Sequence, residues 1–67
     1  MKLLELRQKK GLTQKQLAKT VGVSDVTIGH YEKERRHPKP RMLKELSKAL
    51  DCTVDELLAD PEEVRND

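Results

Sequence analysis

Residues 12–33 of this 67-residue chain read LTQKQLAKTVGVSDVTIGHYEK, and this stretch decides the fold. Thr13 and Gln16 have the spacing of a capping box, in which a hydroxyl and an amide satisfy two backbone donors at the start of a helix. Gly22 fits the left-handed position that ends a helix, and Ser24 is suited to cap the next helix only two residues later. The stretch therefore predicts two helices that are joined by a tight turn and cross steeply.

The second of these helices, over roughly residues 24–33, has two unlike faces. At about 100° per residue, Ile28 and Tyr31 fall on one side of the helical wheel, and we expect that side to be buried. The opposite side carries Val26, Gly29, His30 and Lys33, with Asp25 and Thr27 at its edges. Valine is a weak helix former, and a glycine inside a helix costs about 1 kcal/mol relative to alanine. Because Val26 and Gly29 lower the stability of the helix, their presence on the outer face indicates a binding surface.

Helices are also expected on both sides of this pair, over roughly residues 2–10 and 40–50. A last helix begins with a second capping box, formed by Thr53 and Glu56. No strand is predicted, because no run of strand length alternates apolar and polar residues. The apolar residues expected to pack from these helices are Leu3, Leu6, Leu43, Leu46, Leu50, Val54, Leu57 and Leu58. The fold class is therefore all-α, a compact five-helix bundle in one domain over residues 1–60.

Charge is divided unevenly along the chain. Residues 1–44 hold 12 Lys and Arg against 4 Asp and Glu, whereas residues 45–67 hold 2 against 8. A basic body favours a polyanion as partner, and the acidic end should point away from that partner. Residues 61–67 are expected to form an acidic C-terminal tail.

Several classes of protein are disfavoured. No window holds the roughly 18 apolar residues of a membrane span, and the start MKLLELRQKK is too charged for a secretory signal, so we expect a cytoplasmic protein with no membrane partner. Cys52 is the single cysteine, which excludes an internal disulfide. Because His30, His37 and Cys52 lack the spacing of metal ligands, no metal or other cofactor is expected. With no catalytic set and no phosphate-binding glycine loop, the sequence predicts neither an enzyme nor a small-molecule ligand.

One set of residues at fixed spacing carries a family resemblance: the run Leu12-Thr-Gln-Lys-Gln-Leu-Ala18, then Val21-Gly-Val-Ser24, Ile28, Glu32 and Pro38. From about Leu3 to Leu58 the chain resembles the helix-turn-helix family of phage repressors and Cro, also called the Xre family. The resemblance implies a lambda-repressor-like fold, in which the third helix enters the major groove of DNA and the second lies across the backbone. It also implies a homodimer on a palindromic operator.

The resemblance assigns roles to single residues. The family's base-reading positions are occupied by Asp25, Val26 and His30, and its phosphate-binding positions by Gln14, Ser24, Thr27 and Lys33. The loop after the third helix should lie beside the DNA, so Arg35, Arg36 and Lys39, with His37 and Arg41 nearby, are further phosphate-binding candidates.

Two positions near the reading face have a special backbone role. Gly29 would let the helix backbone come close to the groove of DNA. Glu34 stands where relatives usually have glycine, so the third helix is expected to run on further or to end differently.

We predict a sequence-specific transcription regulator of double-stranded DNA, a repressor, acting as a homodimer. Leu57, Leu58 and Val64 are placed to serve either the monomer's own core or a dimer seam. The alternative from another class is a protein-interaction adaptor with the same fold. Within the DNA-binding class, a phage-type repressor, an antitoxin and a restriction-modification controller share this pattern, and no residue separates them.

Overall fold

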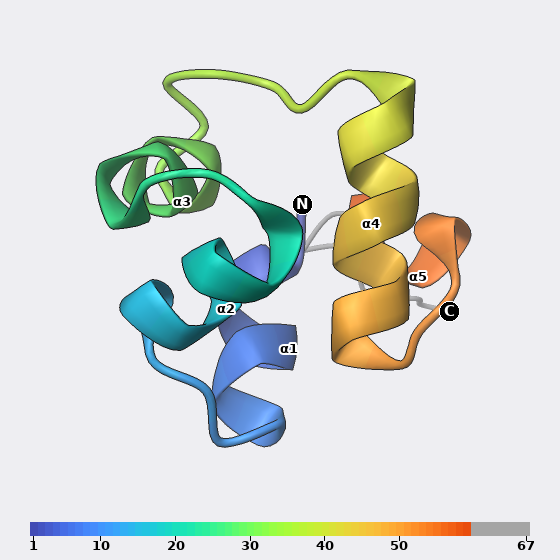
Figure 1. Cartoon of the computed structure of the whole chain (residues 1–67). Helices are drawn as coiled ribbons and strands as arrows, with labels where there is room; N and C mark the ends of the chain where they lie inside the picture. The colour runs from blue at the N-terminus through green and yellow to red at the C-terminus, as the bar shows by residue number, and fades with distance from the viewer. Residues whose placement is uncertain (60–67) are drawn as a thin grey trace.

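The computed structural model describes residues 1–59, and Figure 1 shows the path of the chain. Over these residues it forms five α-helices and no strand: α1 (Leu3–Lys9), α2 (Gln14–Val21), α3 (Asp25–Glu32), α4 (Pro40–Leu50) and α5 (Val54–Leu58). The prediction of an all-α, five-helix fold is thus confirmed. The domain boundary predicted at residue 60 and the acidic tail predicted over residues 61–67 lie outside the described residues.

Every helix contributes one side chain to the centre of the core. Five aliphatic side chains have no exposed surface: Leu3 from α1, Leu17 from α2, Ile28 from α3, Leu46 from α4 and Leu57 from α5. Ala18, Tyr31 and Leu50 complete the buried apolar cluster. Removing one aliphatic side chain of this size from water is worth about 1.5–3 kcal/mol. No helix can therefore leave the bundle without exposing part of the core.

Both capping boxes form as predicted. The Thr13 hydroxyl oxygen accepts a hydrogen bond from the Gln16 N–H at 3.0 Å, and the Gln16 amide oxygen accepts one from the Thr13 N–H at 2.9 Å. The same pair of bonds joins Thr53 and Glu56, at 3.0 and 2.8 Å. The hydrogen bonds from the backbone and side chain of Thr53 lower the pKa of Glu56, because they favour the carboxylate form. These boxes fix where α2 and α5 begin.

Four helices are followed, within two residues, by a residue in the left-handed region of the backbone. Two of these residues are Gly11 and Gly22, and two are acidic, Glu34 (φ 60°) and Asp51 (φ 56°). At Glu34 the backbone N–H donates to the carbonyl of Tyr31 at 3.1 Å, and the next N–H, that of Arg35, donates to the carbonyl of His30 at 2.9 Å. Such paired bonds close a helix around a residue that is usually glycine, and a side chain in this conformation costs of order 1 kcal/mol.

Glu34 thus adopts the conformation that the family's glycine would adopt. The expectation that the third helix would run on past this position is wrong, because α3 ends at Glu32 and the chain turns at Glu34 with φ 60°. The Glu34 carboxylate also accepts a hydrogen bond from the amino group of Met1 at 2.7 Å. The loop that follows α3 therefore starts from an ordinary left-handed turn.

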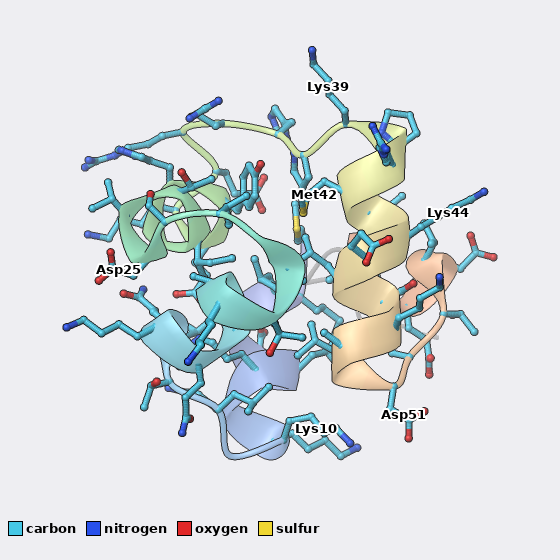
Figure 2. All side chains as sticks on the ribbon, in the orientation of Figure 1. Lys10, Asp25, Lys39, Met42, Lys44 and Asp51 are labelled. Atoms are coloured by element: carbon cyan, nitrogen blue, oxygen red, sulfur yellow. The ribbon has the colours of Figure 1, made fainter. Side chains whose placement is uncertain are left out.

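The packing places α3 at one side of the molecule. α2 packs against both α3 and α4, α1 contacts α3, and α4 packs against α5. In Figure 1, α3 and α5 lie on opposite sides of α4, and the loop over residues 33–39 crosses one end of the bundle. Pro38 is buried and anchors this loop, while its neighbours His37 and Lys39 are exposed. Lys39 points away from the protein, and Asp51 lies at the other end of α4 (Figure 2).

One predicted core residue is exposed. Leu57 has no exposed surface, but Leu58 is 49% exposed, so of the two roles predicted for Leu58 a place in the monomer's core is wrong, and a dimer seam stays a prediction. Successive residues of a helix point about 100° apart, and the five-residue α5 has only one side against the bundle.

Within residues 1–59, no helix combines the length and the apolar composition that a membrane crossing needs.

Candidate functional site

α3 is anchored along one side and open along the other. Ser24 caps its start, its hydroxyl oxygen accepting the Thr27 N–H at 3.2 Å. Ile28 and Tyr31 are buried, as the helical wheel predicts, and Val26 is 62% exposed, more than any other large apolar side chain of the described residues. The predicted division of this helix into an inner and an outer face is confirmed.

The open side of α3 forms one wall of a groove, which we call the α3 groove. It is lined by Gln14, Asp25, Val26, Gly29, His30, Lys33 and Arg35. The structure therefore brings together all three predicted base-reading residues and three of the predicted phosphate-binding residues. Figure 2 shows Asp25 on the outer side of α3, at the first turn of the helix. A carboxylate is favoured there because the N-terminus of a helix carries a partial positive charge.

Ser24 and Thr27 do not line the α3 groove. Their hydroxyl oxygens lie 3.0 Å apart, so one hydroxyl donates to the other. The hydrogen of the accepting hydroxyl is not consumed by this bond. The pair therefore closes the start of α3 and keeps one O–H for a further partner.

Gly29 is not required by the fold of the chain itself. A Cβ atom built at this residue would lie 3.6 Å from Nε2 and 4.0 Å from Oε1 of Gln14, which is ordinary van der Waals contact. Gly29 has none of the positive φ angles found at Gly11 and Gly22. Alanine would thus fit and would favour the helix by about 1 kcal/mol. The glycine therefore lowers the stability of α3 without a reason inside the described residues.

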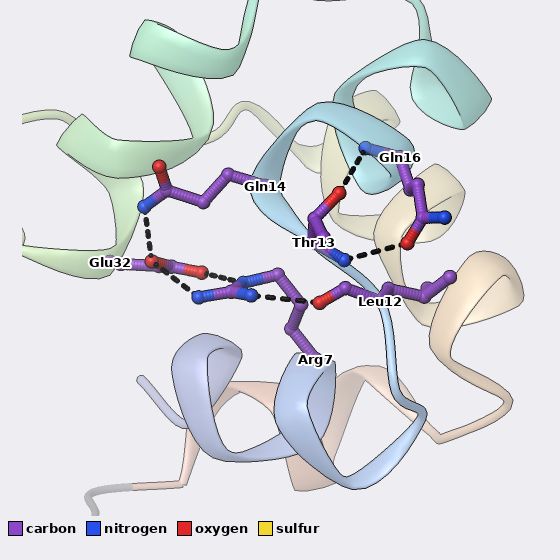
Figure 3. A network of polar contacts seen from close by, with 6 residues as sticks. All are labelled: Arg7, Leu12, Thr13, Gln14, Gln16 and Glu32. Carbon is purple, nitrogen blue, oxygen red and sulfur yellow. Dashed lines mark hydrogen bonds and ion pairs between the residues drawn. The ribbon is translucent and has the colours of Figure 1, made fainter.

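A polar network lies behind the α3 groove and joins three helices (Figure 3). Glu32, at the end of α3, is paired with Arg7 of α1 through Nε at 2.5 Å and Nη2 at 3.4 Å. Gln14, the first residue of α2, donates from Nε2 to the same carboxylate at 2.8 Å. Arg7 also donates from Nη1 to the carbonyl of Leu12 at 2.8 Å. Sequence reasoning missed Arg7 altogether and gave Glu32 no contact, because these partners are far apart in the chain.

The remaining predicted cations lie around a second groove, which we call the loop groove. It is lined by Tyr31, Arg36, His37, Lys39, Arg41 and Met42. Arg36 and Lys39 are therefore separated from the α3 groove, while Arg35 belongs to it. Positive charge is concentrated in the loop groove, since no acidic residue lines it.

Cys52 shows no sign of reactive chemistry. The thiol is half-buried and packs against the core. Burial raises its pKa, and the nearby carboxylates of Glu56 and Asp51 raise it further, so the nucleophilic thiolate is disfavoured. No group of three or more His, Cys, Asp or Glu side chains within residues 1–59 is arranged to hold a metal ion.

Two helices joined by a tight turn, the second with an open outer face, define a helix-turn-helix domain. The chain belongs to the helix-turn-helix family, whose model matches residues 3–57. Proteins similar to this chain over the matched residues are transcription regulators, and the prediction of a non-enzymatic domain agrees with this.

Proteins similar to this chain include both an activator and a repressor. It is 43% identical over 61 residues to the HTH-type transcriptional activator BcrR of Enterococcus faecalis, covering 91% of this chain and 30% of the activator. It is 44% identical over 52 residues to the repressor protein C2 of Salmonella phage P22, covering 78% of this chain and 24% of the repressor. An uncharacterized HTH-type transcriptional regulator of Archaeoglobus fulgidus is 34% identical, and 91% of its length is covered. The chain thus spans less than a third of BcrR and of the C2 repressor.

A solved structure also resembles this fold. The crystal structure of the P22 c2 repressor in complex with a synthetic operator superposes with a TM-score of 0.81 at 40% identity. The match covers 85% of this chain and 86% of that one. The predicted resemblance to phage repressors is confirmed in both sequence and fold.

Proposed function

We propose that the protein is a sequence-specific regulator of transcription that inserts α3 into the major groove of double-stranded DNA. The observation that carries the proposal is the outer side of α3, where an exposed valine, a destabilising glycine and a histidine line one groove with two cations. Its similarity to a repressor crystallised on an operator supports the same proposal. The major groove of B-form DNA is wide enough to admit an α-helix.

Three side chains would read bases. Val26 is exposed enough to contact a thymine methyl group, and His30 can hydrogen-bond to a base edge. Asp25 would accept a hydrogen bond from the amino group of cytosine and repel bases that present only acceptors.

Phosphates would be held by side chains beside α3 and by cations of the loop that follows it. Lys33 and Arg35 line the α3 groove, and Gln14 lies at the start of α2, where a helix favours anions. The free O–H of the Ser24 and Thr27 pair would donate to a phosphate beside α3. Arg36 and Lys39, in the loop groove, would contact the backbone further along.

We further propose a homodimer that represses a promoter in the cytoplasm. Leu58 and Leu4 are large apolar side chains that are 49% and 39% exposed. The N–H of Lys2 donates to the carbonyl of Leu57 at 2.8 Å, so the start of α1 lies beside the end of α5. These exposed leucines form the candidate dimer seam. A dimer would place two α3 helices on a palindromic site and multiply their affinities.

Binding to random duplex at increasing salt tests the function directly. Affinity should fall steeply with salt, because phosphate contacts release counterions. Lys33→Ala should weaken binding to all sequences alike and reduce the salt slope by about 1, whereas Val26→Ala, His30→Ala and Asp25→Asn should change the bases selected from randomised duplexes. A protein-interaction adaptor would show no salt-dependent affinity, and an unchanged motif in all three variants would refute the assignment of readers.

Sedimentation at micromolar concentration, with and without a selected duplex, tests the dimer. Leu58→Glu should leave a folded monomer with weaker binding to the palindrome, and Val26→Glu is the control that leaves the seam intact. Finding only monomers of the wild-type protein in both conditions would exclude the dimer. A reporter behind the selected operator tests repression, since a regulator that activates would raise its expression.

A further inference from the structure

Asp25 and Val26 are consecutive residues in the first turn of α3, and both line the α3 groove. Their Cα atoms are about 3.8 Å apart, and their side chains point about 100° apart around the helix. Val26 is 62% exposed, so its methyl groups are open to a ligand. Within residues 1–59, no hydrogen bond or ion pair uses the Asp25 carboxylate, which leaves its oxygens free to accept. An apolar surface and a pure acceptor therefore lie side by side.

Gly29 keeps the space between these two side chains open. It lies four residues after Asp25 and three after Val26, and residues at these spacings are neighbours on the surface of a helix. A Cβ built at Gly29 would meet only the Gln14 amide, at 3.6 and 4.0 Å, and neither the Asp25 nor the Val26 side chain lies within 4 Å of it. The edge of a base can thus lie between the carboxylate and the valine, over the backbone of Gly29.

The two side chains make different demands on the base that they face. In the major groove, cytosine presents an amino donor on C4, adenine presents a donor without a methyl group, and thymine presents a C5-methyl group beside an O4 acceptor. The Asp25 carboxylate needs the donor, and Val26 gains from the methyl group. None of the four standard bases presents both, whereas 5-methylcytosine carries them on neighbouring ring atoms, C4 and C5.

We propose that Asp25 and Val26 together read one 5-methylcytosine, so that the protein binds a methylated operator more tightly than the same operator without the methyl group. The proposal rests on the proposed function, since it needs α3 in the major groove. Asp25 accepts from the amino group on C4 and repels the O4 of thymine, and Val26 packs on the methyl group. Methylation of the DNA then regulates where the protein binds.

Binding to duplexes that differ at one base tests the proposal. A duplex is selected with the wild-type protein, each of its cytosines is replaced in turn by 5-methylcytosine, and dissociation constants are measured by fluorescence anisotropy. At one position, methylation should increase affinity about fourfold, as expected for burying one methylene-sized group, about 0.8 kcal/mol. Thymine at that position, paired with adenine, should bind about 5- to 150-fold more weakly than 5-methylcytosine, because its O4 faces the carboxylate.

Two variants separate the two parts of the contact. Val26→Ala should bind the methylated and unmethylated duplexes alike, because the apolar partner of the methyl group is gone. Asp25→Asn should still gain from methylation but should bind thymine nearly as well as 5-methylcytosine, because an amide can also donate. Thr20→Ala is the control: it also shortens an exposed β-branched residue, lines neither groove, and should keep the wild-type ratios. Circular dichroism checks that each variant is folded.

The wild-type protein alone can overturn the proposal, whether or not a variant folds. It is wrong if no cytosine of the selected duplex gains from methylation, and also if the gain persists in Val26→Ala. If affinity falls when a thymine beside the cytosine is replaced by uracil, while methylation of the cytosine has no effect, the two side chains read two adjacent bases and the proposal is again wrong. Absence of salt-dependent binding to any duplex would instead reject the proposed function, and the proposal with it.

Discussion

Gly29→Ala should stabilise the protein and weaken its binding to DNA. Inside a helix, alanine is favoured over glycine by about 0.8–1.0 kcal/mol. The new Cβ would meet the Gln14 amide at 3.6 and 4.0 Å, so no atom has to move to admit it. We expect the free energy of unfolding to rise by about 0.8 kcal/mol, which for a domain of this size raises Tm by roughly 3–6 °C.

The opposite effect is expected in the complex. If the backbone of α3 approaches the bases at Gly29, the added methyl group overpacks that contact, which typically costs about 1–3 kcal/mol. Affinity for the selected duplex should therefore fall about 5- to 150-fold. Thermal unfolding followed by circular dichroism gives the first quantity, and fluorescence anisotropy with labelled duplex gives the second.

Thr20→Ala is the matched control for this experiment. Thr20 is exposed on α2 and lines neither groove. Alanine there should also stabilise its helix, by about 0.5 kcal/mol, but leave DNA binding unchanged. If the Gly29→Ala protein is less stable than wild type, the conclusion that a Cβ fits at residue 29 is wrong. If it is more stable but binds DNA as tightly as wild type, the backbone of α3 does not approach the bases at this residue.

Three further predictions concern stability and reactivity. Glu34→Gly should raise the free energy of unfolding, measured by urea titration, by about 0.5 kcal/mol, because glycine adopts the left-handed conformation without strain. Two smaller effects oppose this gain: glycine is freer in the unfolded chain, and the ion pair with Met1 is lost. A loss of stability would contradict the prediction. Because folding lowers the pKa of Glu56, its carboxylate contributes to the free energy of unfolding above the ordinary pKa of a glutamate, and this contribution is lost as pH falls through the lower folded-state pKa. Glu56→Gln should therefore make the free energy of unfolding depend less on pH in the acid range. An unchanged pH dependence would argue against this. Cys52 should react with iodoacetamide at pH 7.5 more slowly than free cysteine and reach the unfolded rate only in denaturant, since burial and two carboxylates raise its pKa; a rate equal to that of free cysteine would disprove this.

Helix boundaries were predictable because their signals are local. Thr13 with Gln16, Ser24, and Thr53 with Glu56 satisfy backbone donors within three residues, so the sequence spacing alone specifies each bond. The inner face of α3 was predictable for the same reason, since one rotation of about 100° per residue relates Ile28 to Tyr31.

Predictions failed where neighbours along the chain do not decide the outcome. Glu34 takes a left-handed conformation that its residue type disfavours, because the end of α3 and the loop anchored at the buried Pro38 require a turn there. Leu58 is as apolar as Leu57, and only the way in which α5 docks on α4 leaves it exposed. The helical wheel puts Glu32 near Ile28, on the inner side, but gives no partner for a charge in that place.

The sequence by itself determined the five helices, the turn between α2 and α3, and the outward position of Val26, His30 and Lys33, because capping and helical periodicity act over a few residues. Only the tertiary structure decided that Arg35 joins the α3 groove while Arg36 and Lys39 line another, and that Arg7, Glu32 and Gln14 meet. Glu32 is separated from Arg7 by 25 residues and from Gln14 by 18, so their contact depends on how three helices pack. Packing is a property of all the buried side chains together, and no single stretch of the chain contains it.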